Sequence, residues 1–198
     1  MPRIISNEER ELIKQSLQRA SITLIKRKGL RYVTVDDITK ATGIAKGSFY
    51  LYYQTKEELL YEVVKIAEKK AFDAILSFRF NEGDLKRNVE TVLREIFLAQ
   101  DSIALYIQPE DIEFFIRKFP AEIREKEKIK SQNNLSQIGV FFGLSETDSG
   151  TLAHLMEGLQ YIATCNPEYG KASHQQSLDV LVHTIAEFIY EKTTKRGA

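Results

Sequence analysis

Cysteine and long apolar runs are scarce in this chain of 198 residues, and their scarcity excludes several classes of protein. The single cysteine, Cys165, rules out a disulfide framework within the chain and cannot make a zinc cluster alone. No apolar run approaches the ~18 residues that span a membrane, and the N-terminal segment MPRIISNEER has no signal-peptide core. We therefore expect a cytoplasmic protein without a membrane partner.

Strand patterns and recognisable catalytic or metal sites are also missing. β-branched residues are scattered, and no stretch alternates cleanly between apolar and polar residues. His154, His174 and His183 are widely spaced, and no pair has a recognised metal-site spacing with a carboxylate. No nucleophile–base–orienter set and no phosphate-cradling glycine loop is visible. We expect no metal, no cofactor and no enzymatic activity, and we interpret Cys165 as a small apolar residue.

The charges that are present are unevenly distributed. The chain has 28 Lys and Arg against 28 Asp and Glu, yet residues 1–53 carry 10 basic and 5 acidic residues while residues 54–198 carry 18 and 23. A basic end beside an acidic remainder suggests an anionic partner, such as nucleic acid, for the N-terminal part. The hydrophobic content of 43% is that of an ordinary globular chain, long enough for one or two domains with a real core.

Helix signals recur along the whole chain. Three early segments begin with a capping box, in which a hydroxyl and an acid three residues later satisfy free backbone N–H groups: Ser6 with Glu9, Thr34 with Asp37, and Thr55 with Glu58. Glycine, proline and polar breaks separate the further helical patterns. The sequence therefore predicts an all-α fold with helices at about 7–28, 35–42, 46–53, 56–80, 85–100, 102–107, 110–118, 121–141, 148–165 and 174–193.

Two short helices joined by a tight turn at Gly43, behind a longer helix, are the ingredients of a helix-turn-helix. At ~100° per residue, Phe49 and Tyr53 share the side of the second short helix that packs on the other helices. The opposite side carries Gly47, Ser48 and Leu51, and Tyr50 and Tyr52 project from its two flanks.

This arrangement suits the major groove of DNA. Small residues allow close approach, Ser48 can hydrogen-bond a base edge or a phosphate, and Leu51 can touch a thymine methyl group. Tyrosine hydroxyls, lysines and helix starts can contact phosphates. The alternative is an aromatic-rich helix hairpin whose tyrosine tips are exposed to solvent. The predicted DNA-binding residues are Thr34, Lys46, Gly47, Ser48, Tyr50, Leu51, Tyr52 and Lys56.

The last two predicted helices share one apolar pattern. Each has a continuous stripe with the spacing i, i+3, i+4, i+7, i+10 and i+11. Such a stripe packs either into the chain's own core or against a second copy in an intermolecular four-helix bundle, and the spacing does not decide between them. The candidate dimer-interface residues are Leu152, Leu155, Met156, Leu159, Leu178, Leu181, Val182, Ile185, Phe188 and Ile189.

Residues 33–64, VTVDDITKATGIAKGSFYLYYQTKEELLYEVV, resemble the DNA-binding signature of the TetR family of bacterial transcriptional regulators. The resemblance extends back to about residue 12, and beyond about residue 64 it is architectural only. Three residues depart from the family's pattern and could alter operator preference or weaken binding: Ala45 for a frequent Ser, Thr39 for a small Ala, and Gln54 for Pro or Lys. The matching residues are Thr34, Val35, Asp37, Ile38, Gly43, Ile44, Lys46, Gly47, Ser48, Phe49, Tyr50, Tyr52, Thr55, Lys56, Glu57 and Leu59.

The resemblance implies two domains and a regulatory function. It implies a three-helix helix-turn-helix DNA-binding domain at 1–54 and a helical ligand-binding and dimerisation domain at 55–198, with 55–80 as the connecting helix. The expected protein is a homodimeric repressor that leaves a palindromic double-stranded operator when a small-molecule effector binds. An activator on the same architecture, a helical small-molecule-binding protein with a vestigial DNA-binding half, and a helical enzyme are the alternatives.

The effector that this resemblance implies would bind among the central helices. Their aromatic and soft side chains favour an apolar or aromatic effector, while nearby acids and bases leave a charged one open. Most of these side chains are better explained as plain core than as a pocket lining. The candidate pocket residues are Phe72, Phe97, Tyr106, Phe114, Phe115, Phe119, Met156 and Tyr161.

Overall fold

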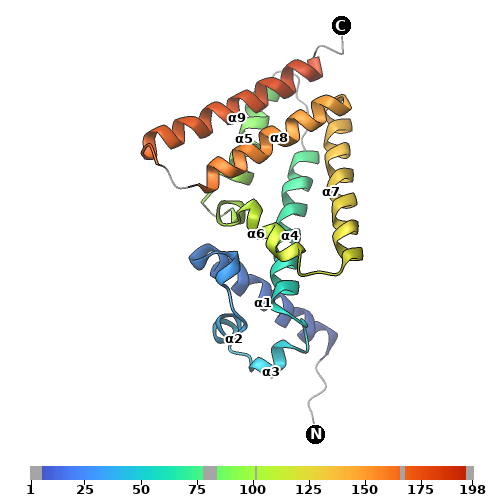
Figure 1. Cartoon of the computed structure of the whole chain (residues 1–198), viewed down its shortest axis with the longest axis vertical. Helices are drawn as coiled ribbons and strands as arrows, with labels where there is room; N and C mark the ends of the chain where they lie inside the picture. Colours follow the sequence, from blue (N-terminus) through green and yellow to red (C-terminus); the bar gives the residue numbers. More distant parts are fainter. Residues whose placement is uncertain (1–5, 78–83, 101, 166–167, 195–198) are drawn as a thin grey trace. The chain divides into compact units, whose positions relative to one another are not determined.

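Figure 1 shows the computed structural model of the chain, which describes residues 6–77, 84–100, 102–165 and 168–194. Within these ranges the regular structure is entirely helical, so the predicted all-α class is confirmed. The chain divides into two compact units, Met1–Glu68 and Lys69–Ala198. Helix α4 (Lys56–Leu76) runs through this division as one continuous helix. The functional boundary predicted between residues 54 and 55 stays a prediction.

The first unit consists of three complete helices and the beginning of α4. These are α1 (Asn7–Lys28), α2 (Val35–Thr42) and α3 (Lys46–Phe49), with a short 3₁₀ turn, η1 (Leu30–Tyr32), between α1 and α2. The bounds predicted for α1 and α2 are confirmed. Both predicted capping boxes form at the helix beginnings, at Ser6 with Glu9 and at Thr34 with Asp37, and Gly29 and Gly43 follow the last helical residues. The η1 turn was not predicted from the sequence.

The second short helix is shorter than predicted. The sequence predicts 46–53, but α3 ends at Phe49 and the chain continues in turns through Tyr50–Tyr52. The turns keep Phe49 and Tyr53 on one side, since the N–H groups of Tyr52 and Tyr53 donate to the carbonyl of Phe49 at 3.0 and 3.1 Å. Both side chains are buried, as predicted. The apolar core of this unit is formed by Leu17, Leu24, Ile25, Leu30, Val33, Ile38, Phe49, Tyr53, Leu59, Leu60, Val63 and Val64.

The second unit holds the end of α4 and the remaining elements. They are α5 (Leu85–Phe97), the 3₁₀ turn η2 (Ile103–Tyr106), α6 (Pro109–Ile116), α7 (Ala121–Phe141), α8 (Glu146–Thr164) and α9 (Lys171–Thr194). The prediction for α7 matches its bounds, α5 ends three residues before the predicted 100, and α8 and α9 begin two and three residues early. The end predicted for α4, at 80, lies outside the described residues.

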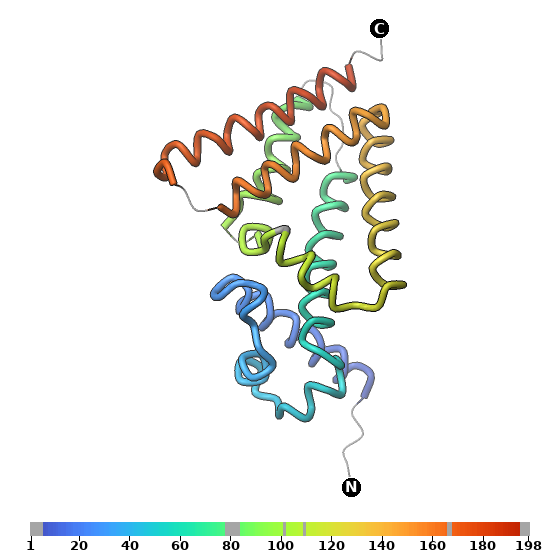
Figure 2. The backbone as a smooth tube through the Cα atoms, in the orientation of Figure 1, coloured from blue at the N-terminus to red at the C-terminus, as the bar shows by residue number. Residues whose placement is uncertain are grey.

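Helices α5, α8 and α9 pack against one another and α7 packs on α8 (Figure 2). Their shared core contains the buried faces of the two long C-terminal helices together with Val89, Leu93, Ile138 and Phe142. The η2 turn is attached to α8 by the Gln160 amide, whose Nε2 donates to the carbonyls of Ala104 at 2.6 Å and Ile107 at 3.1 Å. This unit therefore has one continuous apolar core.

Candidate DNA-binding surface

The turn between α2 and α3 is built by backbone geometry. Gly43 has φ 72° and ψ 12°, the left-handed region that glycine enters at little cost, and its N–H donates to the carbonyl of Thr39 at 2.9 Å. Thr39 is buried where α2 packs, and its hydroxyl donates to the carbonyl of Val35 at 2.9 Å, within its own helix. This departure from the family's pattern is therefore accommodated without an unpaired polar group.

The start of α2 is held by a charged cluster. One oxygen of Asp37, Oδ2, accepts from the Lys28 ammonium at 2.5 Å, from the Thr34 N–H at 2.9 Å and from the Thr34 hydroxyl at 2.5 Å. These donors, Lys28 first, hold the pKa of the Asp37 carboxyl well below its usual range. Thr34, a predicted phosphate contact, therefore also caps α2 and fixes its first turn.

The side of α3 that the sequence assigns to DNA faces solvent. Gly47 is exposed, Ser48 is half-buried and Leu51 is 62% exposed, while Tyr50 is 51% exposed and Tyr52 is half-buried. Phe49 lies beneath them with its ring edge-on to Tyr50, at 5.4 Å between centroids. The structure thus brings these five predicted DNA-binding residues to one exposed turn.

The two lysines assigned to phosphates have partners within the chain. The Lys46 ammonium lies 2.8 Å from Asp36 Oδ1, and this carboxylate raises the pKa of Lys46. The Lys56 ammonium donates to the carbonyls of Val33 at 2.8 Å and Arg31 at 3.2 Å. Lys56 therefore joins the loop before α2 to the first turn of α4, a structural role that the sequence analysis did not predict.

The N-terminus of α3 lacks a side-chain cap. Its N-cap residue is Ala45, which has extended backbone angles and no side-chain oxygen to accept from the helix. This departure from the family's pattern therefore leaves α3 without a side-chain cap. At the next junction the Glu58 N–H donates to Thr55 Oγ1 at 3.1 Å, but the Glu58 carboxylate accepts from the Gln54 N–H at 2.8 Å instead of the predicted Thr55 N–H.

Sequence reasoning missed a row of polar side chains on α1 that reaches the tyrosine run. The Arg10 guanidinium lies over the Tyr52 ring at 5.5 Å and donates from Nη2 to the Leu51 carbonyl at 3.0 Å. The Lys14 ammonium lies 5.5 Å from the centroid of Tyr53, and Gln18 Nε2 lies 3.4 Å from the Tyr53 hydroxyl. Their spacing of four residues along a helix is the signal that could have found them.

Burial changes the acidity of Tyr53, the last of the three tyrosines in this segment. Burial first, and then the Glu62 carboxylate, raise the pKa of Tyr53 far above its ordinary value. Gln18 Nε2 donates to Glu62 Oε1 at 3.2 Å, so the hydroxyl end of this buried ring lies in a polar network. Tyr53 is therefore a neutral, packed residue that supports the exposed turn.

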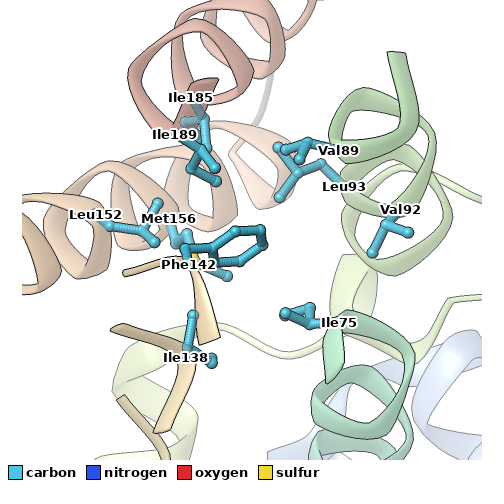
Figure 3. A pocket seen from close by; sticks show the side chains of 10 residues that line it. All are labelled: Ile75, Val89, Val92, Leu93, Ile138, Phe142, Leu152, Met156, Ile185 and Ile189. Carbon is cyan, nitrogen blue, oxygen red and sulfur yellow. The ribbon is translucent and has the colours of Figure 1, made fainter. Parts of the chain in front are cut away.

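The predicted pocket residues are not gathered around one cavity. In the part of the second unit that the structure describes, a cavity of about 20 Å³ lies among α4, α5, α7, α8 and α9 (Figure 3), and Met156 alone of the eight predicted residues lines it. Phe72 and Phe97 are half-buried at the core's edge, Phe115 is fully buried, Tyr106 and Phe119 are half-buried, and Phe114 and Tyr161 are exposed. The cavity is lined by Ile75, Val89, Val92, Leu93, Ile138, Phe142, Leu152, Met156, Ile185 and Ile189.

The candidate interface residues on α8 and α9 fall into two groups. Six are buried in the chain's own core: Leu152, Leu159, Leu178, Val182, Ile185 and Ile189. The other four, Leu155, Met156, Leu181 and Phe188, are half-buried at its edge. Only the second group retains surface for another molecule.

The histidines of the described ranges are not gathered into a metal site. His183 pairs with Glu90 at 2.9 Å, and no group of three or more His, Cys, Asp or Glu residues in these ranges is arranged to hold a metal ion. No helix among them has both the length and the apolar character required to cross a membrane.

Part of the chain matches a known protein family. Residues 17–63 match the family described as bacterial regulatory proteins, tetR family. The curated relative YuxN of Bacillus subtilis, an uncharacterized HTH-type transcriptional regulator, is 27% identical over 152 residues, 72% of this chain and 50% of its own. IcaR of Staphylococcus epidermidis, a negative transcriptional regulator of the biofilm operon icaADBC, is 29% identical over 93 residues, 44% of this chain and 48% of its own. These alignments thus span about half the length of each relative.

A solved structure shows the same fold. A transcriptional regulator from Rhodococcus sp. matches with a TM-score of 0.61 and 20% identity, covering 88% of this chain and 96% of that chain. The similarity of fold therefore extends beyond the matched residues 17–63.

Proposed function

Because the chain belongs to the TetR family of bacterial regulatory proteins, we propose that it represses transcription as a homodimer. In this proposal each copy places α3 and the turn Tyr50–Tyr52 in the major groove of a two-fold symmetric operator. A small-molecule effector bound in the second unit releases the DNA. Effector binding would have to favour the DNA-free arrangement by its difference in affinity for the two states, typically ~1–3 kcal/mol.

The observation that carries the DNA-binding proposal is Gly47. Glycine in a helix interior is less stable than alanine by roughly 0.5–1 kcal/mol. Gly47 does not have the positive φ that favours glycine, and a Cβ placed on it would meet no atom of the chain within 4 Å. The fold therefore has no internal need for glycine here, whereas a DNA backbone or base edge approaching α3 closely would need it.

Gly47→Ala tests this argument, because stability and binding should change in opposite directions. We expect the variant to unfold at a slightly higher temperature, in line with a gain of roughly 0.5–1 kcal/mol, and to bind its preferred duplex at least about tenfold more weakly. Gly150→Ala, in α8 and equally free of neighbours, is the matched control that should retain DNA affinity. Unchanged DNA affinity in Gly47→Ala would remove the main support for the proposal.

The pairing of Lys46 with Asp36 is the observation that favours the alternative of a vestigial DNA-binding half, since this carboxylate competes with phosphate. A salt titration with duplexes selected from a randomised library separates the two functions. A regulator should show selective binding whose affinity falls steeply with salt, and Asp36→Asn should strengthen it. Absence of selective binding at ~100 mM salt would favour the alternative.

Homodimer formation is supported by the outer surface of α8 and α9. Besides the half-buried group, Tyr161 is 57% and Val180 is 58% exposed, on long helices whose opposite faces are fully packed. Val180→Asp should convert a dimer into a monomer in native mass spectrometry. Val140→Asp is the control, since Val140 is 78% exposed on α7, away from the proposed interface. A wild-type monomer at micromolar concentration would contradict the proposed dimer.

The effector site is proposed at the apolar cavity of Figure 3, which supports an apolar ligand because its lining offers no polar side chain. At about 20 Å³ it holds little more than one water-sized group, so a ligand would have to displace side chains around it. A panel of small aromatic and aliphatic compounds, screened by thermal shift, should include one that stabilises wild type and dissociates the DNA complex. Val92→Phe, which fills the cavity, should weaken that effect; an equal effect would place the site elsewhere.

A further inference from the structure

We infer that Arg10 is a positioning residue for DNA sequence choice, an inference that rests on the proposed DNA binding. Arg10 lies on α1, 41 residues before Leu51 in the chain, yet its Nη2 donates to the Leu51 carbonyl at 3.0 Å. Its guanidinium also lies 5.5 Å from the centroid of the Tyr52 ring. One side chain thus holds both the backbone and an aromatic ring of the exposed turn that carries Tyr50, Leu51 and Tyr52.

The turn at Tyr50–Tyr52 requires a contact with another helix, because few interactions within it stabilise its conformation. Helix α3 has four residues and no side-chain cap, far fewer than the ~12–15 residues at which an isolated helix becomes even marginally stable. After Phe49 the turn is held by single backbone bonds, from the Leu51 N–H to the Ser48 carbonyl at 3.2 Å and from the Tyr52 N–H to the Phe49 carbonyl at 3.0 Å. The buried rings of Phe49 and Tyr53 secure one side only.

Arg10 secures the other side. It donates a charge-assisted bond to the Leu51 carbonyl, and its flat guanidinium lies over the Tyr52 ring at the same time. A lysine ammonium is a point charge that cannot donate in one plane and stack in another. The position of Arg10 is itself fixed, since the capping box of Ser6 and Glu9 begins α1 one turn before it. The orientation of Leu51 toward a base pair therefore depends on α1.

A direct phosphate contact is the rival role for an exposed arginine, and the two roles have different signatures. A phosphate contact contributes equally to all sequences and adds ~0.9 to the slope of log affinity against log salt. A positioning residue that orients Leu51 changes the ratio between preferred and unrelated sequences and leaves that slope unchanged.

The experiment compares Arg10→Met, Arg10→Lys and the control Arg19→Met, an exposed arginine on the same helix. Each is titrated with a duplex selected by wild type from a randomised library and with a scrambled duplex, at several salt concentrations. We expect both Arg10 variants to lose about tenfold in the affinity ratio of the two duplexes, with the wild-type salt slope, and Arg19→Met to match wild type. An equal loss on both duplexes with a slope reduced by ~0.9, or no loss, would overturn the inference.

A second measurement does not depend on DNA. Hydrogen exchange of the full-length protein, followed by mass spectrometry, should show faster exchange at the amides of Leu51–Tyr53 in Arg10→Met than in wild type and Arg19→Met. Unchanged exchange there refutes the positioning role even if DNA binding is established. Conversely, faster exchange in a protein that binds no duplex selectively would leave the attachment in place and refute the proposed function instead.

Discussion

At the scale of single residues, Asp37 joins the end of α1 to the beginning of α2. Its carboxylate accepts from Lys28 and twice from Thr34, and these donors hold its pKa well below the ordinary value of 3.8. A carboxyl whose pKa is depressed by folding stabilises the fold above its unfolded pKa, and this contribution is lost as the pH falls through the folded pKa. The helix-turn-helix should therefore lose part of its stability in acid.

Asp37→Asn should show this dependence directly. At pH 7 we expect a loss of unfolding free energy on the order of 1 kcal/mol or less, because the paired side chains are partly solvated. The difference from wild type should shrink as the pH is lowered below 3.8, where the carboxyl of the unfolded wild-type chain begins to be protonated while that of the folded chain stays ionised. Urea unfolding at a series of pH values measures it, with Asp73→Asn, in an exposed pair with Lys69, as the control. A difference that stays constant with pH would exclude the charge as the cause.

Ala45 is the residue at which the sequence departs from a good helix start. A serine at this N-cap could accept from the free N–H groups of α3, a change worth roughly 0.5–2 kcal/mol in other helices. Ala45→Ser should therefore raise the unfolding temperature and strengthen binding to the selected duplex by ordering α3. Ala41→Ser, exposed on α2 where no cap is needed, should show neither gain. A loss of affinity would mean that the small methyl group itself faces the DNA.

At the scale of secondary-structure elements, three polar side-chain pairs form a ladder between α5 and α9. Lys86 pairs with Glu187 at 2.5 Å, Glu90 with His183 at 2.9 Å, and Arg94 with Asp179 at 2.6 Å. The partners are four residues apart on both helices and run in opposite directions, so the helices are antiparallel and in one register. The middle pair has its acid on α5, whereas the two outer pairs have their acids on α9. A shift of one helix by a turn would therefore bring like charges together.

Exchanging the partners of one pair, Arg94 and Asp179, tests whether the paired charges help to select the register between α5 and α9. Arg94→Asp alone places two acids together and should lower the urea midpoint, while Arg94→Asp with Asp179→Arg should restore most of it. Arg94 holds the pKa of Asp179 below its ordinary value. The greater stability of wild type over Arg94→Asp should therefore be present at pH 7 and decline below pH 3.8. A double variant as unstable as the single one would show that the pair contributes through packing alone.

The sequence predicts those features of the helices that depend on residues close together in the chain. The bounds of α1 and α2 follow from capping boxes a few residues long, and the burial of Phe49 and Tyr53 follows from helical spacing. The early end of α3 and the attachment of Arg10 to Leu51 do not, because they depend on contacts between residues far apart in the chain. Aromatic content likewise does not say which side chains meet, and Met156 alone of the eight candidate pocket residues lines the cavity of Figure 3.

At the scale of the whole molecule, charge is divided along the chain. The net charge is zero, but residues 1–53 carry five more basic than acidic residues and the remainder carries five more acidic than basic ones. DNA therefore attracts the helix-turn-helix end of the chain and repels the rest. In the proposed complex this distribution would favour encounters in which α3 meets the duplex, without the nonspecific affinity of a protein that is basic throughout.

A homodimer bound to DNA should be sensitive to the distance between its half-sites. Two recognition helices reach successive major grooves on one face of the duplex when half-sites lie one helical turn apart, ~34–36 Å. Inserting about 5 bp between the half-sites of a selected duplex turns one of them to the opposite face. We expect affinity to fall by at least about tenfold, measured by fluorescence anisotropy. The same insertion placed outside the half-sites should have no effect, and equal affinity for both duplexes would mean that each copy binds DNA independently.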